Sequence, residues 1–324
     1  MAARAFWTMG RGVGELREEV LRSPGASDVV VDALYSGISR GTEALVFHGR
    51  VPVSEHQRMR APHQAGEFPF PVKYGYLSVG RVAQGPAALL GKAVFCLYPH
   101  QSRYVVAADQ VVPLPDGVPA ARAVLAGNLE TAINAVWDAE LRVGDRVAVV
   151  GGGVVGCLVA YLAGRMVGCA VELVDLEPGR AAVAAALGVG FSTPDRARSE
   201  ADVVIHSSGQ PAGLATAISL AGQESTVVEL SWYGDQLVPL PLGGAFHARR
   251  LRLVSSQVGE LLAAQRARWT RRRRLELALA LLVDARFDIL IDQEGAFEDL
   301  PTELPRLTSA AGSLCYRVRY GQEA

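Results

Sequence analysis

A run of glycines in the middle of the chain has the spacing of a nucleotide-binding loop. Gly151, Gly153 and Gly156 form G-x-G-x-x-G directly after an apolar run, and an apolar stretch of helical length follows. The first glycine permits a tight turn, the second lets the backbone approach a pyrophosphate, and the third lets helix and strand pack closely. Asp175 ends the next apolar run, about 20 residues after the last glycine. A carboxylate there accepts hydrogen bonds from the ribose hydroxyls of NAD and repels the 2′-phosphate of NADP, so these residues predict an NAD site.

Further contacts to the cofactor are expected near this loop, because ligands of doubly wound sheets bind at the carboxyl ends of the strands. They comprise the start of the helix, a basic residue after the acid, and serines in two later loops. The candidates are Val154, Val155, Arg180, Ser207, Ser208 and Ser231. Serine hydroxyls also bond to the nearby backbone in ordinary turns, which explains these serines equally well. A glycine turn that only packs would leave Asp175 unexplained.

Length and composition limit the class of protein. The 324 residues suffice for two domains, and with 50% hydrophobic and 20% charged residues the chain has the composition of a globular protein. The formal net charge of -1 gives no global attraction to nucleic acid. No apolar stretch reaches the roughly 18 residues of a membrane span, and the N-terminus lacks the apolar core of a secretory signal. With four scattered cysteines and no disulfide framework, we expect a cytoplasmic protein with a small-molecule substrate, and no nucleic acid or membrane as partner.

The distribution of apolar runs predicts an α/β protein with two domains. Up to about residue 118, short apolar runs are separated by Gly and Pro, which indicates a β-rich region. After that, strand-like runs alternate with segments of helical length, the pattern of a doubly wound parallel sheet. We assign 1–128 and 260–324 to a β-rich domain, and 129–259 to a Rossmann dinucleotide-binding domain.

Taken together, these features resemble the medium-chain dehydrogenase/reductase superfamily of the zinc alcohol dehydrogenase type. Besides the glycine loop, the resemblance rests on LYSGISRGTE (34–43), KYGYLSVGRV (73–82), VVPLPDGV (111–118) and LETAINAV (129–136). It spans essentially the whole chain and implies a GroES-like catalytic domain, with Thr131 beside the nicotinamide. It also implies a homodimer through edge pairing of Rossmann sheets, for which 225–234 is a candidate edge.

The chain departs from this family at the positions of the zinc ligands. Where zinc enzymes have a Cys, a Gly-His-Glu and a third ligand, this chain has Ser39, Tyr76 followed by Leu77, and Gly127. Catalytic zinc needs three protein ligands that offer N, S or carboxylate O. The resemblance therefore implies a metal-free member. The sequences of the first two motifs are most similar to a group that contains the dehydrogenase that oxidises a hydroxyethyl group on bacteriochlorophyllide.

Without zinc, side chains must bind the substrate oxygen and move its proton. Tyr76 is the first candidate, because a phenol can donate to a developing oxyanion. A buried tyrosine with a satisfied hydroxyl is an equal explanation. Lys73 could lower the pKa of that phenol, although a solvated lysine is the commoner case.

Two further catalytic candidates fall where zinc enzymes keep a hydroxyl relay and an acid. Thr42 could pass a proton through the ribose hydroxyls while Glu43 orients it. Alternatively, Glu43 pairs with Arg40 and holds the loop. Arg40 could also reach the cofactor pyrophosphate. Asn128 and Glu130 could touch substrate or cap the next helix.

Three functions are compatible with these residues. The first is a zinc-independent, NAD-dependent oxidoreductase acting on a secondary alcohol or ketone. The second is an enoyl or quinone reductase, which Asp175 disfavours because many of those relatives prefer NADPH. The third is a dinucleotide-binding protein without catalysis. The long basic segment 47–73 is either a solvated loop or a lid that recognises an anionic or polyhydroxylated substrate.

Overall fold

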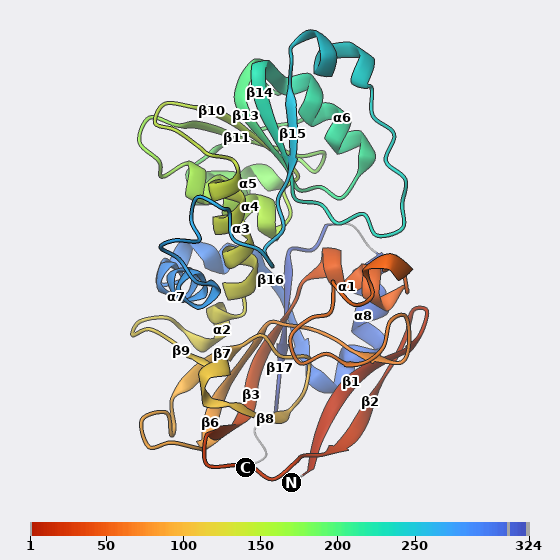
Figure 1. The fold of residues 1–324 in the computed structure, drawn as a ribbon, viewed down its shortest axis with the longest axis vertical. Coiled ribbons are helices and arrows are strands. Elements are labelled where there is room, and N and C mark those ends of the chain that lie inside the picture. Colours follow the sequence, from red (N-terminus) through yellow and green to blue (C-terminus); the bar gives the residue numbers. More distant parts are fainter. Residues whose placement is uncertain (1, 310–311, 322–324) are drawn as a thin grey trace. The chain divides into compact units, whose positions relative to one another are not determined.

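The structure, a computed structural model, describes residues 2–309 and 312–321 and divides the chain into two compact units (Figure 1). Unit 1 consists of Met1–Gly127 and Leu279–Ala324, and unit 2 of Asn128–Ala278. The second boundary lies later in the chain than the expected 259/260, because helix α7 (Arg271–Leu281) begins with residues that pack within unit 2. Among the described residues, no helix is long and apolar enough to cross a membrane.

Unit 1 is built on two sheets that are antiparallel apart from one strand pair. The first has the order β2-β1-β5-β4 and consists of β1 (Ala2–Gly10), β2 (Val13–Val20), β4 (Ala65–Gly66) and β5 (Val72–Lys73). The second has the order β16-β17-β3-β6-β7-β9, with β8 also paired to β3. Its strands are β3 (Asp28–Ile38), β6 (Ser78–Gln84), β7 (Ala93–Cys96), β8 (Arg103–Ala107), β9 (Val112–Pro113), β16 (Ile291–Ala296) and β17 (Cys315–Arg319).

The tail of the chain completes the larger sheet of unit 1. Strand β17 pairs antiparallel with β3, from Tyr316 opposite Ile38 to Arg319 opposite Tyr35, and β16 joins β17 in parallel. The helices of this unit are α1 (Arg40–Phe47), η1 (Val53–Glu55), η2 (Ala108–Gln110), α2 (Ala120–Ala123), η4 (Ala285–Leu290), η5 (Phe297–Asp299) and α8 (Leu300–Ser309). Apolar side chains of α1 and α8 pack with β1, β3 and β17 in one core cluster, so residues from both ends of the chain stabilise this unit.

Unit 2 has the predicted Rossmann architecture. All neighbouring strands of its six-stranded sheet are parallel, in the order β12-β11-β10-β13-β14-β15. The strands are β10 (Arg146–Val150), β11 (Ala170–Val174), β12 (Gly190–Ser192), β13 (Ala201–His206), β14 (Ala221–Glu229) and β15 (Arg252–Ser255). The other elements are α3 (Ala126–Asp138), α4 (Val154–Ala163), α5 (Arg180–Leu187), α6 (Pro211–Leu220) and η3 (Leu242–Phe246), in addition to α7. The predicted fold class, a β-rich domain plus a doubly wound parallel sheet, is confirmed.

The position of β14 corrects one expectation. Residues 225–234 were a candidate edge for pairing with a second copy, yet β14 lies between β13 and β15 and bonds to both. Strand β15 follows it at that end of the sheet. The apolar run at Thr226–Val228 suits an inner position, because strands of a parallel sheet are buried on both faces.

A buried arginine joins α7 to the start of unit 2. Arg274, 1% exposed, donates from Nε to Glu130 at 3.1 Å, and from its other nitrogens to Asn134 and to the carbonyl of Val258. Glu130 is itself buried, and burial raises the pKa of its carboxyl even though Arg274 lowers it. Glu130 is therefore engaged in a buried ion pair with Arg274, and the two roles expected for it, contact with substrate and capping of the next helix, stay predictions.

Removal of this arginine should destabilise unit 2 strongly. We expect Arg274→Met to lower the free energy of unfolding by about 3–5 kcal/mol, because it leaves a buried carboxylate without its partner. Urea denaturation followed by circular dichroism would measure this. Arg272→Met, which removes an exposed pair with Glu276, is the matched control and should cost at most about 0.5 kcal/mol. Equal effects of the two substitutions would contradict this account.

Candidate functional site

The glycine loop of unit 2 has the close contacts that its sequence predicts. Gly151 follows β10 with a φ of +113°, and a Cβ there would lie 2.6 Å from the backbone nitrogen of Ser208. A Cβ on Gly156 would lie 1.9 Å from the carbonyl oxygen of Gly151. Neither position can hold a larger residue without movement of the backbone, so the first and third glycines serve turn and packing.

The second glycine has a different environment. Gly153 is the residue before α4, and a Cβ built on it would meet nothing within 4 Å. Val154 and Val155 form the first turn of this helix and are only half-buried. An open face beside a helix N-terminus fits the pyrophosphate of a dinucleotide, because unpaired N–H groups and the helix dipole favour an anion there.

Asp175 and Arg180 lie next to this loop. The Asp175 carboxylate accepts hydrogen bonds from the N–H of Gly152 at 2.5 Å and of Glu177 at 2.8 Å. A Cβ on Gly152 would lie 3.1 Å from both Asp175 Oδ2 and Arg180 Cγ, so both side chains border the loop. Each carboxylate oxygen has a second lone pair, which leaves Asp175 able to accept from ribose hydroxyls.

Three of the predicted serines lie at the carboxyl ends of β13 and β14. Ser207 Oγ donates to the carbonyl of Gly151 at 3.1 Å, which ties this strand end to the glycine loop. Ser231 Oγ accepts from the N–H of Gly209 at 3.0 Å, and Ser208 Oγ accepts from the N–H of Gln210 at 3.2 Å. Such bonds between serine side chains and the backbone are common in turns. They hold the hydroxyls at the edge of the sheet where dinucleotides bind in this type of fold.

Sequence reasoning missed a histidine–glutamate pair behind these serines. His206 is fully buried, with Nδ1 2.8 Å from Glu229 Oε2 and Nε2 2.6 Å from Ser208 Oγ. The Tyr233 hydroxyl also donates to Glu229, at 3.0 Å; burial and that carboxylate together raise the pKa of the phenol. The only signal in the sequence was a polar residue at the last position of two apolar runs.

The two remaining cofactor candidates lie in helices, one in each unit. Thr131 is a half-buried residue of α3 in unit 2, and Arg40 is the first residue of α1 in unit 1. Their contacts to a cofactor stay predictions.

In unit 1, the structure brings Tyr76 together with the start of α1. The Tyr76 hydroxyl forms hydrogen bonds with the side chains of Ser39 and Thr42. Burial raises the pKa of this phenol to about 12; the two hydrogen bonds oppose the shift, and the Glu43 carboxylate adds to it. The phenol is therefore protonated at neutral pH, with two hydroxyl donors placed to stabilise a phenolate.

Glu43 lies in a chain of buried hydrogen bonds that the sequence did not reveal. Its Oε1 accepts from the N–H of Ser39 at 2.7 Å, and its Oε2 is 2.9 Å from Nε2 of His100. His100 Nδ1 is 2.7 Å from Ser36 Oγ, which is 2.9 Å from the Tyr320 hydroxyl. Glu43 is thus bonded to His100 and to the backbone of Ser39, and the hypothesis that it pairs with Arg40 stays a prediction.

Lys73 is directed to other partners than Tyr76. Its ammonium donates to Glu19 at 2.6 Å and to Gln101 at 2.7 Å, and it lies 5.7 Å from the centre of the Trp7 ring. Its charge is engaged in this buried ion pair, and it is not among the groups that shift the pKa of Tyr76. The structure therefore gives no support to the expectation that Lys73 lowers that pKa.

The residues at the family's zinc positions do not fit zinc. Ser39 and Tyr76 bond to each other, and a Cβ on Gly127 would lie 2.5 Å from Leu77 Cδ2, so the apolar Leu77 fills the space of a third ligand. Within residues 2–309 and 312–321, no three side chains of the His, Cys, Asp or Glu type are grouped to hold a metal ion. Hydroxyl and phenol groups alone are not the donor set of a zinc site.

The segment 47–73 is held by bonds among its own residues. Arg60 donates to Glu67 at 2.8 Å and to the carbonyls of Gln64 and Gly66, both at 3.2 Å. His56 is bonded to the carbonyl of Val51 at 3.1 Å. This arrangement orders the segment within unit 1, and its role as a lid stays a prediction.

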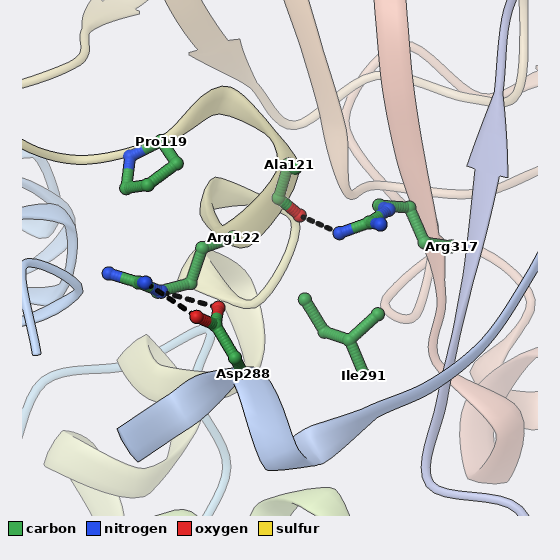
Figure 2. Close-up of a pocket in the computed structure, with 6 residues that line it drawn as sticks. All are labelled: Pro119, Ala121, Arg122, Asp288, Ile291 and Arg317. Carbon is green, nitrogen blue, oxygen red and sulfur yellow. Dashed lines mark hydrogen bonds and ion pairs between the residues drawn. The ribbon is translucent and has the colours of Figure 1, made fainter. Parts of the chain in front are cut away.

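A pocket elsewhere in unit 1 contains none of the predicted site residues. This cavity has a volume of about 390 Å³. Figure 2 shows the residues that line it, Pro119, Ala121, Arg122, Asp288, Ile291 and Arg317. Arg122 donates to both carboxylate oxygens of Asp288 at 2.7 Å (Figure 2). Arg317 donates to the carbonyl of Ala121 and pairs with Glu294. Both positive charges are compensated, so the pocket has no free charge for an anionic ligand.

Comparison with known proteins identifies the fold. No model of a protein family matches the sequence, and no curated protein does. Among solved structures, L-idonate 5-dehydrogenase from Escherichia coli has a TM-score of 0.80 at 15% identity, over 98% of both chains. A Sinorhizobium meliloti protein described as a zinc-binding dehydrogenase, solved with NADP, has a TM-score of 0.77 at 18% identity over 98% of this chain and 99% of that one.

A third similar structure was solved with the other nicotinamide cofactor. It is an Escherichia coli protein described as a short chain alcohol dehydrogenase, in complex with NADH, with a TM-score of 0.76 at 15% identity over 98% of this chain and 99% of that one. At such identities the likeness establishes the fold, which is the two-domain α/β fold of these dehydrogenases.

Alanine at two glycines should separate cofactor binding from folding. Gly153 has a φ of −73° and free space around it, so Gly153→Ala should leave the Tm unchanged and weaken NADH binding about tenfold or more, roughly 1.4 kcal/mol. Gly156→Ala should lower the Tm, because its methyl group meets backbone. Fluorescence titration with NADH and calorimetry would measure the two effects. NADH binding unchanged by Gly153→Ala would show that the open face is not the dinucleotide site.

Proposed function

We propose that this chain is an NAD(H)-dependent oxidoreductase that transfers hydride between the nicotinamide and a secondary alcohol or ketone, without zinc. The observation that carries the proposal is the Tyr76 phenol held by the Ser39 and Thr42 hydroxyls. Ser39 and Tyr76 stand at the sequence positions where the enzymes that the chain resembles bind their metal, and Thr42 stands where they keep a hydroxyl relay residue. Burial of hydroxyl groups costs desolvation free energy, so packing alone does not explain why three of them are gathered here.

The chemistry of the cluster matches proton donation to a ketone oxygen. The nicotinamide, when bound, supplies or accepts the hydride. As negative charge develops on the substrate oxygen, the Tyr76 hydroxyl donates its proton, and the hydroxyls of Ser39 and Thr42 donate to the phenolate that remains. In the direction of oxidation, the same phenolate accepts the proton of the alcohol.

Several finer features belong to the same proposal. Asp175 beside the glycine loop supports NAD over NADP, because its carboxylate would repel the 2′-phosphate of NADP. The name of L-idonate 5-dehydrogenase contains a polyhydroxylated carboxylate, which suits the hypothesis of an anionic or polyhydroxylated substrate. A homodimer remains what the family resemblance implies, and a cytoplasmic location remains what the scattered cysteines predict.

Loss of the Tyr76 hydroxyl should slow proton transfer and leave cofactor binding intact. We expect Tyr76→Phe to lower kcat for ketone reduction by about 10²–10⁴-fold, with the Kd for NADH unchanged. Steady-state kinetics over a panel of ketones and polyols, with fluorescence titration of NADH, would measure both. Tyr74→Phe removes the hydroxyl of the neighbouring buried ring, 6.0 Å away, and should keep near wild-type turnover. Full activity of Tyr76→Phe would remove this residue from the mechanism.

Metal removal should have no effect on the reaction. We expect protein dialysed against a chelator, and shown to be metal-free by elemental analysis, to keep its kcat and its affinity for NADH. Added Zn²⁺ should not increase either. A loss of turnover that Zn²⁺ restores would overturn the zinc-independent part of the proposal, while leaving the cofactor assignment in place.

A further inference from the structure

A histidine and a glutamate end two neighbouring strands of unit 2. His206 is the last residue of β13 and Glu229 the last residue of β14, and the two are opposite each other in the parallel pairing. His206 is fully buried, and its Nδ1 lies 2.8 Å from Glu229 Oε2. The residues before them, Ile205 and Val228, are buried and apolar. An apolar side chain at position 206 would avoid the desolvation of an imidazole, so the pair is kept at a cost in free energy.

Glu229 also anchors the loop that follows β14. Its Oε1 accepts from the backbone N–H of Ser231 at 2.6 Å, and its Oε2 accepts from the hydroxyl of Tyr233 at 3.0 Å. Ser231 Oγ in turn accepts from the N–H of Gly209, in the loop after β13, at 3.0 Å. Together with His206, these bonds tie the two loops to each other and to the strand ends.

The other ring nitrogen of His206 lies at the loop before α6. Its Nε2 is 2.6 Å from Ser208 Oγ, which accepts from the N–H of Gln210 at 3.2 Å. Gly213 belongs to the first turn of α6, and a Cβ there would lie 2.2 Å from Ser208 Oγ and 2.7 Å from His206 Nε2. The absence of a side chain at Gly213 therefore makes room for the imidazole and the hydroxyl beside the helix.

The topology of the sheet indicates which part of a dinucleotide these loops would meet. The strand order reverses between β10 and β13. In doubly wound sheets of this order, each half of the sheet binds one nucleotide of the cofactor. The half with β10, β11 and β12 carries the glycine loop and Asp175, which is proposed to bind the ribose that bears the 2′-phosphate in NADP. The loops after β13 and β14 belong to the other half, and the nicotinamide nucleotide is the part that remains for them.

We propose that His206 and Glu229 are positioning residues for the nicotinamide half of the cofactor, an inference that rests on the proposed NAD(H) function: through Ser231 and Tyr233 they order the loop after β14 before the cofactor binds. A loop that is already ordered loses less conformational freedom when a ligand binds against it. Without the pair, that loss would weaken the binding of the nicotinamide. The adenosine half would bind as before, because backbone N–H groups of the loops after β10 and β11 hold Asp175.

Two ligands that differ in the nicotinamide test this inference. NADH contains that group, whereas ADP-ribose ends at the second ribose. Isothermal titration calorimetry would give both Kd values for wild type and for three variants of His206. We expect His206→Leu to raise the Kd of NADH about tenfold and to change that of ADP-ribose by less than about twofold. His206→Asn places an N–H donor near the position of Nδ1 and should be closer to wild type, whereas His206→Gln reaches the position of Nε2 and should resemble His206→Leu.

Two further variants separate this effect from a loss of stability. Val204, in β13, is fully buried, so Val204→Ala should lower the Tm while both Kd values stay at those of wild type. Tyr233→Phe removes one donor to Glu229 from a half-buried ring. It should raise the Kd of NADH about two- to threefold with little change in Tm, and it decides the question if the His206 variants do not fold.

The outcomes distinguish this inference from the proposed function. Equal changes in both Kd values, no change in either, or rescue by His206→Gln instead of His206→Asn would overturn the role of the pair. If wild type binds NADH but reduces no ketone, the proposed hydride transfer fails, while the Kd values still decide the role of His206 and Glu229. Absence of NADH binding to wild type would overturn both.

Discussion

A carboxylate buried in unit 1 imposes conditions that distant parts of the chain have to meet. A charge at this depth is tolerated only when donors surround it. Helix α1 begins where the Ser39 N–H can reach Glu43, the loop after β7 supplies His100, and Gly75 leaves room for the imidazole ring. Tyr320, next to β17, completes the chain of hydrogen bonds. One charge therefore links the first helix, a central loop and the tail to the phenol of Tyr76.

Unit 2 also contains buried carboxylates, and each is paired with a basic side chain. Arg274 satisfies Glu130 where α7 meets α3, and His206 satisfies Glu229 at the ends of two neighbouring strands. The basic residue of each pair, Arg274 or His206, is almost or fully buried. Removal of either partner would therefore leave the other without compensation. The second pair stands behind the serines at the edge where the glycine loop lies. Polar networks of this kind favour one arrangement of strand ends over its alternatives.

Local sequence predicted the elements and the glycine loop, and distant contacts decided the rest. The loop and Asp175 follow from spacing within one βαβ unit, and the structure has β10 and β11 as parallel neighbours. Lys73 is hydrogen-bonded to Glu19, 54 residues away in the sequence, and Glu43 to His100, 57 residues away. Ser36 is bonded to Tyr320, which is 284 residues away. No pattern of neighbours encodes such pairs. The inner position of β14 likewise depends on β15, a short and weakly apolar run that the sequence did not mark as a strand.

The division of unit 1 between two stretches of sequence has a consequence for synthesis. Unit 2 is continuous, so on the ribosome all of its residues emerge before Leu279, whereas the sheet of unit 1 waits for β17 to pair with β3. During that interval β3 has β6 and β8 as partners, but no β17 on its other flank. The nascent chain therefore exposes an unpaired strand edge until β17 has been synthesised, a period in which aggregation and chaperone binding compete with folding.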